Sequence, residues 1–254
     1  MKVTFLGTGT STGIPLIGCQ CATCHSSDPR DKRLRTSVWL ETQSMSVVID
    51  AGIDFRQQAL SWKISTVDAV LYTHHHVDHI FGLDDLRPIN FIQNKTISIY
   101  ATSLTLEHLQ RIYPYVFDGQ NYPSDIPKIK YHTFEDRSFE VGSLPVFPIP
   151  VYHGDLLIHG FRIGNFAYLT DVNHIPLESY PLLEKLEVLV LGALRERPHP
   201  THFTLEQALS EARKIGARKT YLVHMSHELS HHQLQERLPS EIQPAFDGLQ
   251  LELT

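Results

Sequence analysis

The sequence predicts an α/β fold in which helices cover the outer faces of β-sheets. Segments with strand character alternate with segments of helical character in both halves of the chain, and polar side chains of the metal-binding type stand where apolar strands stop. With 254 residues, of which 42% are hydrophobic and 20% charged, the chain has a globular composition and can bury a sizeable core. No low-complexity segment or long linker divides it, so we expect one domain over residues 1–254.

In the first half, short apolar runs bounded by turn residues predict strands. The first strand leads into a loop rich in Gly, Thr and Ser, and a later strand ends at a histidine-rich turn. The predicted strands cover residues 3–6, 38–40, 47–49, 67–72 and 97–100, and the predicted helices cover 55–62 and 104–113. Residues 115–127 are expected to form a loop.

In the second half, Gly164-Asn165 between two apolar runs predicts a hairpin turn. Gly216 follows an amphipathic stretch and is placed to cap the C-terminus of a helix. The predicted strands cover residues 146–151, 161–163, 166–170, 188–191, 220–223 and 249–253, and the predicted helices cover 182–186, 205–215 and a short helix that ends over 234–238.

Residues 74–79 read H-H-H-V-D-H and contain the pattern H-x-H-x-D-H. Burying so many imidazole and carboxylate groups without partners would cost on the order of several kcal/mol per group. A metal centre is the simplest environment that satisfies them together, whereas the alternative is a histidine-rich loop that binds nothing specific.

Further residues of the same chemistry follow other predicted strands. Because strand ends at one edge of an α/β sheet are where sites are built, we expect these side chains to converge with those of residues 74–79. Seven ligand-type residues are enough for two ions with open positions for water and substrate. The seven candidates are His74, His76, Asp78, His79, His153, Asp171 and His224.

The order and placement of these seven residues resemble those of the metallo-β-lactamase fold superfamily, over essentially the whole chain. The resemblance implies a four-layer αβ/βα sandwich with the site at one edge of its two sheets. It also implies that His74, His76 and His153 hold one ion, that Asp78, His79 and His224 hold the other, and that Asp171 bridges the two. Asp50 ends a strand and would either support a ligand, as in this superfamily, or serve as a turn or helix-capping residue.

Cys19, Cys21 and Cys24 are the only cysteines of the chain and read C-x-C-x-x-C. An odd trio within six residues suits a thiolate cluster better than disulfides. Thiolates select zinc, and a tetrahedral structural zinc site needs a fourth ligand. We expect His227 to be that ligand, since it lies three residues past His224 and would join the zinc site to the wall of the metal centre.

The intact histidine motif together with C-x-C-x-x-C and a later His resembles the PhnP-like phosphodiesterases. Members of that group hydrolyse phosphodiesters, including cyclic phosphates of ribose and 2′,3′-cyclic nucleotides. The resemblance implies a hydrolase in which a hydroxide held between two divalent ions, Mn²⁺ or Zn²⁺, attacks the phosphorus. Asp78 and His202 are the expected catalytic residues, and His202 matches a histidine that would give the leaving group its proton.

Three other functions stay open on the sequence alone. A tRNA 3′-processing endonuclease is disfavoured, because no long insertion is evident and the net charge of −6 argues against an extended nucleic-acid surface without excluding one. An acyl hydrolase of the lactamase or thioesterase type is compatible with the fold. A non-catalytic metal carrier is opposed by the complete ligand set.

The expected surroundings of the protein follow from what the sequence lacks. The N-terminal residues carry no signal-peptide pattern, and no apolar stretch approaches the roughly 20 residues of a membrane span. We therefore expect a cytoplasmic protein with a small-molecule phosphodiester substrate and no membrane partner. A homodimer is expected only from the habit of the family.

Overall fold

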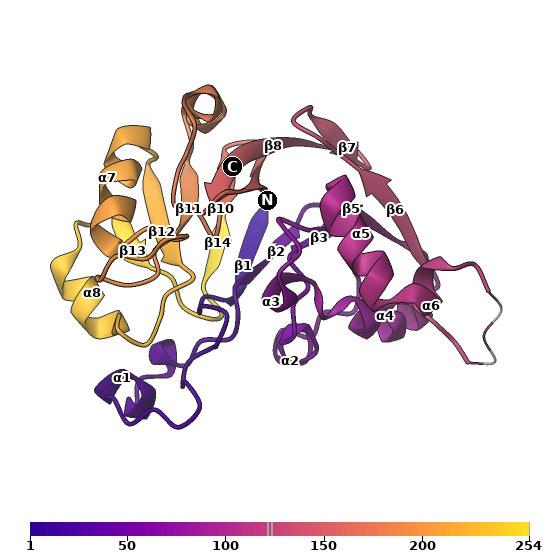
Figure 1. The fold of residues 1–254 in the computed structure, drawn as a ribbon, viewed down its shortest axis with the longest axis horizontal. Coiled ribbons are helices and arrows are strands. Elements are labelled where there is room, and N and C mark those ends of the chain that lie inside the picture. Colours follow the sequence, from indigo (N-terminus) through magenta and orange to yellow (C-terminus); the bar gives the residue numbers. More distant parts are fainter. Residues whose placement is uncertain (121, 123, 254) are drawn as a thin grey trace.

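Two β-sheets that face each other form the centre of the molecule (Figure 1). The computed structural model describes residues 1–120, 122 and 124–253. Among these, the first sheet has the order β14-β1-β2-β3-β4-β5-β6 and the second β13-β12-β11-β10-β9-β8-β7. The strands of the first sheet are β1 (Lys2–Gly7), β2 (Ser37–Glu41), β3 (Ser46–Ile49), β4 (Ala69–Leu71), β5 (Ile97–Ala101), β6 (Ile129–Thr133) and β14 (Gln250–Glu252). Those of the second are β7 (Phe139–Val141), β8 (Leu144–His153), β9 (Leu156–Ile163), β10 (Phe166–Leu169), β11 (Val188–Gly192), β12 (Lys219–Val223) and β13 (Ile242–Pro244).

Both sheets follow the same plan of strand pairing. In the first sheet β14, β1, β2 and β3 pair antiparallel, and β3 to β6 continue in parallel. In the second sheet β7 to β10 pair antiparallel, and β10 to β13 continue in parallel. Parallel strands end at the same edge of a sheet, so each half of the chain supplies one row of carboxyl ends.

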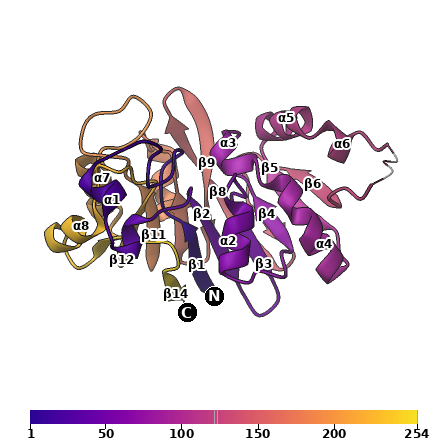
Figure 2. The ribbon, with the colours of Figure 1, turned by 90° about the horizontal axis from the view of Figure 1, so that it is seen from below.

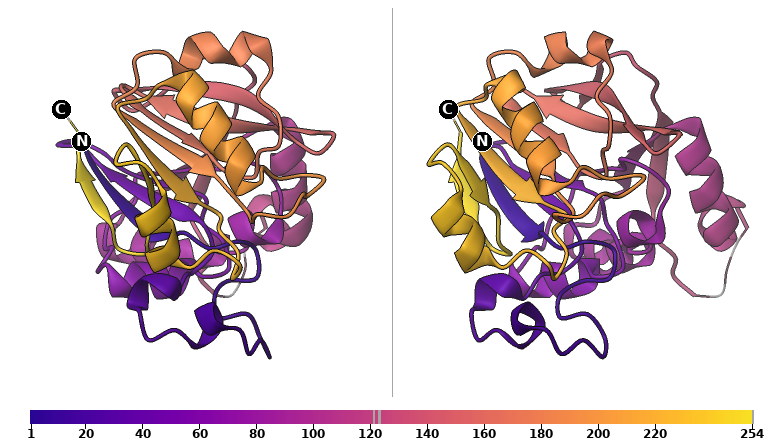
Figure 3. Two further views of the ribbon diagram at one scale, coloured as in Figure 1. Left: turned by 90° about the vertical axis from the view of Figure 1, so that its left-hand side faces the viewer. Right: turned by 60° about the vertical axis from the view of Figure 1, so that its left-hand side comes forward.

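Helices cover the outer faces of both sheets, and α7 lies across the strands of the second sheet (Figure 3). The α-helices are α1 (Ala22–His25), α2 (Phe55–Ser61), α3 (Val77–Ile80), α4 (Arg87–Gln93), α5 (Ser103–Ile112), α6 (Pro114–Phe117), α7 (Leu205–Ile215) and α8 (His231–Arg237). Three short 3-10 helices cover Pro29–Asp31, Leu83–Leu86 and Leu177–Leu183. The predicted bounds of α7 are confirmed, since Thr204 and Gln207 form a capping box at its start and Gly216 ends it with a φ of 68°.

Three apolar clusters separate the layers. Phe5 and Phe161 belong to the cluster between the two sheets. Phe55 and Leu106 pack with the outer face of the first sheet, and Ala208 packs with that of the second. The order of layers is therefore helix, sheet, sheet, helix, which confirms the predicted four-layer αβ/βα sandwich.

The structure corrects several predicted elements. The segment expected to be a loop begins with α6, because Pro114 at the first helical position is preorganised for a helix; residues 121 and 123 of that segment lie outside the described residues. The helix expected at 182–186 is not formed: a 3-10 helix covers Leu177–Leu183 instead, and residues 184–186 are not helical. The edge strand β6 exposes most of its side chains and so offers no apolar run to detect. In the described part of the chain, no helix is both long enough and apolar enough to cross a membrane.

Candidate metal centre

The candidate ligands gather at the edge of the sandwich where the parallel strands end, the edge at which α3 is labelled near the top of Figure 2. Four of them follow β4, either just before α3 or within it, and three lie at or just past the ends of β8, β10 and β12. They are, in this order, His74, His76, Asp78 and His79, then His153, Asp171 and His224. The expected convergence of strand-end residues therefore occurs.

Three strand-end residues at this edge have a left-handed backbone. The φ angle is 63° at Asp50, 53° at Asp171 and 56° at His224. Such a conformation costs on the order of 1–3 kcal/mol for a residue with a side chain, and it concentrates at functional sites. Asp and His are among the residue types that tolerate it best. Asp and His at these positions therefore fit the left-handed turns and also carry side chains that can bind a metal ion or support its ligands.

The ligand atoms fall into groups whose members lie within 4.8 Å of one another. One group is formed by His74, His76 and His153. A second, fully buried group is formed by Asp78, His79, Asp171 and His224. All seven predicted residues thus come together, and Asp171 also belongs to a third group with His153 and His202.

Hydrogen bonds orient three of the imidazole rings through Nδ1. His153 Nδ1 lies 2.8 Å from the carbonyl oxygen of Thr201, and His79 Nδ1 lies 2.7 Å from Asp50 Oδ2. His74 Nδ1 lies 3.0 Å from Thr73 Oγ1. Because a carbonyl or carboxylate oxygen can only accept, Nδ1 of His153 and His79 carries a proton. The Nε2 atoms are then the ones that can bind an ion, as is usual for histidine ligands with such partners.

Asp50 is the centre of this supporting network. Its carboxylate accepts hydrogen bonds from the Thr73 backbone N–H at 2.9 Å and from the Thr73 hydroxyl at 2.8 Å, besides that from His79. The next turn is held close to α3, because a Cβ atom on Gly52 would overlap the backbone carbonyl of Asp78. Of the two roles considered from the sequence, support of a ligand is the one that these contacts fit.

The charges of the site favour a cation. Burial lowers the pKa of His79, but the charges of Asp78, Asp171 and Asp50 raise it well above its usual value. Burial raises the pKa of Asp171, yet the charges of His224 and His79 bring it well below its usual value. The three carboxylates thus create a negative field at this imidazole, and the same field would attract a divalent ion.

Unsatisfied nitrogens test whether a metal fits this site. Among the described residues, Nε2 of His74, His79 and His224 is buried without a hydrogen bond. His79 Nε2 and His224 Nε2 each lie 3.2 Å from a carboxylate oxygen, of Asp78 and Asp171 respectively, which is the arrangement of donors around a shared ion. Buried polar atoms normally have a partner, so these three nitrogens need an explanation. Burial, followed by the charge of His79, lowers the pKa of His74 well below its usual value, which keeps this ring in the neutral form that binds metals. The donor set fits divalent metal ions.

The cysteine cluster forms a separate donor set at α1. Cys19 Sγ lies 3.1 Å and Cys21 Sγ 3.4 Å from His227 Nδ1, and Cys24 completes the group. The backbone N–H of Cys24 lowers the pKa of Cys21 to about 6, which favours the thiolate that zinc binds. His227 therefore occupies the place expected of the fourth ligand.

His202 lies over the metal centre, just before α7. Its ring stacks on that of His224, with centroids 4.7 Å apart, and meets His153 edge-on with centroids 4.6 Å apart. Burial, and then the charge of His224, lowers the pKa of His202 to about 2. The ring is therefore neutral near pH 7, and one of its nitrogens carries a hydrogen.

Comparison with known proteins agrees with this geometry. Residues 46–225 match the beta-lactamase superfamily domain. A solved structure described as a new diphosphatase from the PhnP family is 42% identical, with a TM-score of 0.93 over 100% of this chain and 98% of that one. The chain belongs to the PhnP family of metallo-β-lactamase-fold hydrolases.

Two curated relatives of this PhnP-family chain carry different names. An octanoyltransferase of Porphyromonas gingivalis is 41% identical over 98% of this chain and 51% of its own length. A ribonuclease Z of Clostridium acetobutylicum is 24% identical over 63% of this chain and 53% of its own length. The chain thus spans about half the length of the curated relatives it matches.

Sequence patterns did not identify several residues that surround the metal centre of this PhnP-family chain. Thr73 and Thr201 orient ligand histidines, but a threonine beside a histidine carries no signal of its own. His108 of α5 stacks on His75, with ring centroids 4.0 Å apart, so His75 is turned toward α5. His159 pairs with Asp136 at 2.9 Å and belongs to none of the donor groups.

Proposed function

We propose that the protein is a metal-dependent phosphodiesterase that hydrolyses small or cyclic phosphodiesters, such as ribose cyclic phosphates or 2′,3′-cyclic nucleotides. The observation that carries the proposal is that two adjacent groups of possible metal ligands lie at the same edge of the β-sandwich. The His202 ring stacks on that of His224, which belongs to one of these groups. Phosphodiester cleavage needs a water nucleophile, neutralised phosphoryl oxygens and a proton for the leaving alkoxide. The donor groups and His202 can meet these three needs together.

The two donor groups would divide two divalent ions between them. His74, His76 and His153 would hold one ion, Asp78, His79 and His224 the other, and Asp171 would bridge them. Such ions, when bound, supply Lewis acidity that lowers the pKa of water and neutralises phosphoryl charge. Mn²⁺ and Zn²⁺ both suit the mixed set of imidazoles and carboxylates. A further Zn²⁺ would be held by the Cys19, Cys21, Cys24 and His227 group.

The chain's own residues would then set orientation and proton transfer. Asp50, Thr73 and the Thr201 carbonyl fix the imidazole rings, so little reorganisation is needed when a substrate arrives. Neutral His202 would donate its N–H to an oxygen of the bound phosphate. The negative charge of that phosphate raises the pKa of His202, so the ring can take up a proton from solvent and pass it to the departing oxygen.

A diphosphate bridge is the second candidate bond. The relative that matches over the full length, at 42% identity, is named a diphosphatase. A P–O–P bridge and a phosphodiester present the same charged phosphoryl oxygens and differ in the leaving group, which for a diphosphate is a phosphate of lower pKa. A diphosphate substrate would therefore depend less on His202 than a cyclic nucleotide would.

The names of the curated relatives support other reactions less directly. The octanoyltransferase is about twice as long as the match, so its acyl-transfer activity need not reside in the matched half. The ribonuclease Z relatives share the fold and only part of the chain. An acyl hydrolase and an RNA 3′-processing nuclease are therefore the functions to assay next if the test below shows no turnover.

The test is hydrolysis of bis(p-nitrophenyl) phosphate by the full chain reconstituted with Mn²⁺ or Zn²⁺, followed by a 2′,3′-cyclic nucleotide and a dinucleoside diphosphate. Asp78→Asn serves as the blank, and Asp84→Asn, in the next helical turn but bonded to Tyr115, serves as the matched control. Turnover that needs metal, vanishes in Asp78→Asn and persists in Asp84→Asn supports the proposal. Absence of turnover on all three substrates with two ions bound contradicts it.

A further inference from the structure

The segment from His224 to His227 carries a candidate ligand of the metal centre at one end and a candidate ligand of the cysteine site at the other. It is neither helix nor strand, and it begins with the left-handed turn at His224. A segment of this kind cannot hold two ligands in place through regular backbone pairing alone. Its position must come from the chain packed against it.

Part of that support is a narrow ladder of backbone hydrogen bonds. Met225 donates to Thr8 and accepts from Thr10, both at 3.1 Å, while Gly9 donates to Leu34 at 2.8 Å. The strip of residues 8–10 thus lies between residues 33–35 and Met225. Gly9 is needed there, because a Cβ atom would come within 2.9 Å of Arg33 Cβ.

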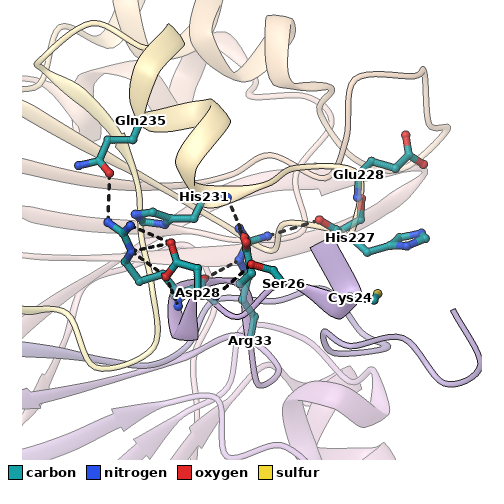
Figure 4. A network of polar contacts seen from close by, with 12 residues as sticks. Cys24, Ser26, Asp28, Arg33, His227, Glu228, His231 and Gln235 are labelled. Atoms are coloured by element: carbon teal, nitrogen blue, oxygen red, sulfur yellow. Dashed lines mark hydrogen bonds and ion pairs between the residues drawn. The ribbon is translucent and has the colours of Figure 1, made fainter. Parts of the chain in front are cut away.

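Arg33 adds support from the side of the cysteine site, besides the Leu194 carbonyl, which accepts a hydrogen bond from the Ser226 N–H at 2.8 Å. Its side chain is fully buried, and its guanidinium Nη1 donates to the carbonyl oxygen of Ser226 at 3.4 Å. Nη2 reaches Asp31 at 3.4 Å, and Nε reaches the Arg30 carbonyl at 3.3 Å. Figure 4 shows Arg33 between the α8 side, where His231 lies, and His227. Asp31 in turn accepts a hydrogen bond from the backbone of His231 at 2.8 Å.

We propose that Arg33 is a positioning residue that fixes the His224–His227 segment, so that the metal affinity of the His224 side of the centre depends on a guanidinium that touches no ligand side chain. Ser226 is the residue between the two ligands whose carbonyl the guanidinium holds. A fully buried arginine is rare unless it is paired, and here its partners are one carboxylate and two backbone carbonyls. The inference rests on the proposed metal centre and not on the identity of the substrate.

The test measures metal binding to the full chain, with no turnover involved. Metal-free protein is titrated with Co²⁺, whose visible spectrum distinguishes binding to thiolates from binding to imidazoles and carboxylates, and bound zinc is counted by elemental analysis. The variants are Arg33→Met, which keeps much of the side-chain volume, and Arg33→Lys, which keeps the charge. Arg162→Met is the matched control, since Arg162 also donates to two backbone carbonyls, those of Gly164 and Leu182.

In Arg33→Met we expect the thiolate band of the cysteine site to persist, while the Co²⁺ affinity at one active-site position falls about tenfold. Tenfold is the lower end of the loss measured when a residue that supports a metal ligand is removed. Arg33→Lys should recover part of that loss, because an ammonium restores the charge but cannot span all three acceptors. Arg162→Met should bind like the wild type.

Wild-type affinity at both active-site positions in Arg33→Met overturns the inference, and so does an equal loss in Arg162→Met. If Arg33→Met fails to fold, Arg33→Lys decides: a weaker active-site ion with an intact thiolate band supports the inference, and unchanged affinity overturns it. Absence of active-site Co²⁺ binding in the wild type overturns the proposed metal centre itself, which separates the two failures.

Discussion

Replacing Asp50 by Asn should weaken metal binding on the His79 side of the centre and leave the fold intact. The buried carboxylate accepts three hydrogen bonds, from the Thr73 N–H, the Thr73 hydroxyl and His79 Nδ1. An Asn side chain can keep the bond to the Thr73 N–H through its carbonyl oxygen. Its NH₂ group cannot accept from His79, so the ring loses both its orientation and the charge that raises its basicity.

The magnitude follows from what is lost at His79. Removing a partner of this type lowers metal affinity by about 10- to 100-fold, which corresponds to about 1.4–2.8 kcal/mol. The backbone should not add to this loss, because Asn tolerates the φ of 63° at this position as well as Asp does. Asp50→Ala would combine the same loss with backbone strain and a cavity, so Asn is the cleaner substitution.

The assay is a titration of metal-free protein with Zn²⁺ or Mn²⁺ by calorimetry, with thermal unfolding recorded alongside. Asp68→Asn is the matched control, since this carboxylate accepts a backbone hydrogen bond from Ser46 beside the opposite end of β4. We expect one weakened ion in Asp50→Asn and none in Asp68→Asn. Two ions of wild-type affinity in Asp50→Asn would refute the reasoning that the carboxylate acts through His79.

Four further predictions follow from other contacts. His202→Ala should keep both ions and lose about 10²- to 10⁴-fold in turnover of a cyclic nucleotide, with a smaller loss on bis(p-nitrophenyl) phosphate; equal losses on the two substrates would exclude proton donation. Cys24→Ser should lose one zinc equivalent by elemental analysis and lower the melting temperature, and retention of that zinc would rule out its role as a ligand. Burial raises the pKa of Asp247 to about 7, so the folded state binds more protons than the unfolded state between about pH 4 and 7, and stability falls as the pH rises through that window; Asp247→Asn should flatten the urea-unfolding profile there, and an unchanged slope would contradict the assignment. Gly52→Ala should displace α3, because its Cβ would overlap the Asp78 carbonyl, and it should reduce metal binding more than Gly164→Ala at a hairpin turn with open space; both have to be compared in the same titration.

The sequence is sufficient to predict those residues of the site that belong to short local motifs. The H-x-H-x-D-H turn follows an apolar run, and His153, Asp171 and His224 each follow another. The apolar runs predict the strands, and the residues at their ends predict the metal ligands. Cys19, Cys21 and Cys24 lie close enough in sequence to reveal a site by spacing alone.

The supporting residues could not be found in the same way. Thr201 contributes only a backbone carbonyl to His153, which any residue type could provide. The sequence around Arg33 predicts a solvent-exposed charged residue, whereas its side chain is fully buried in the structure. The strand β6 and the helix α4 were missed because tertiary packing, and not a strong local pattern, determines them.

The left-handed turns at Asp50, Asp171 and His224 also limit how this centre could be re-engineered. The residues that tolerate such a backbone best are Gly, which has no side-chain donor, and Asn, Asp and His, whose donors are oxygen or imidazole nitrogen and not sulfur. A redesign toward a soft metal such as copper(I) would therefore meet a backbone penalty at these positions before any question of coordination arises. Sulfur donors would instead have to enter at the candidate ligands whose backbone is not left-handed, namely His74, His76, Asp78, His79 and His153, while Asp171 and His224 would keep offering harder donors to the centre.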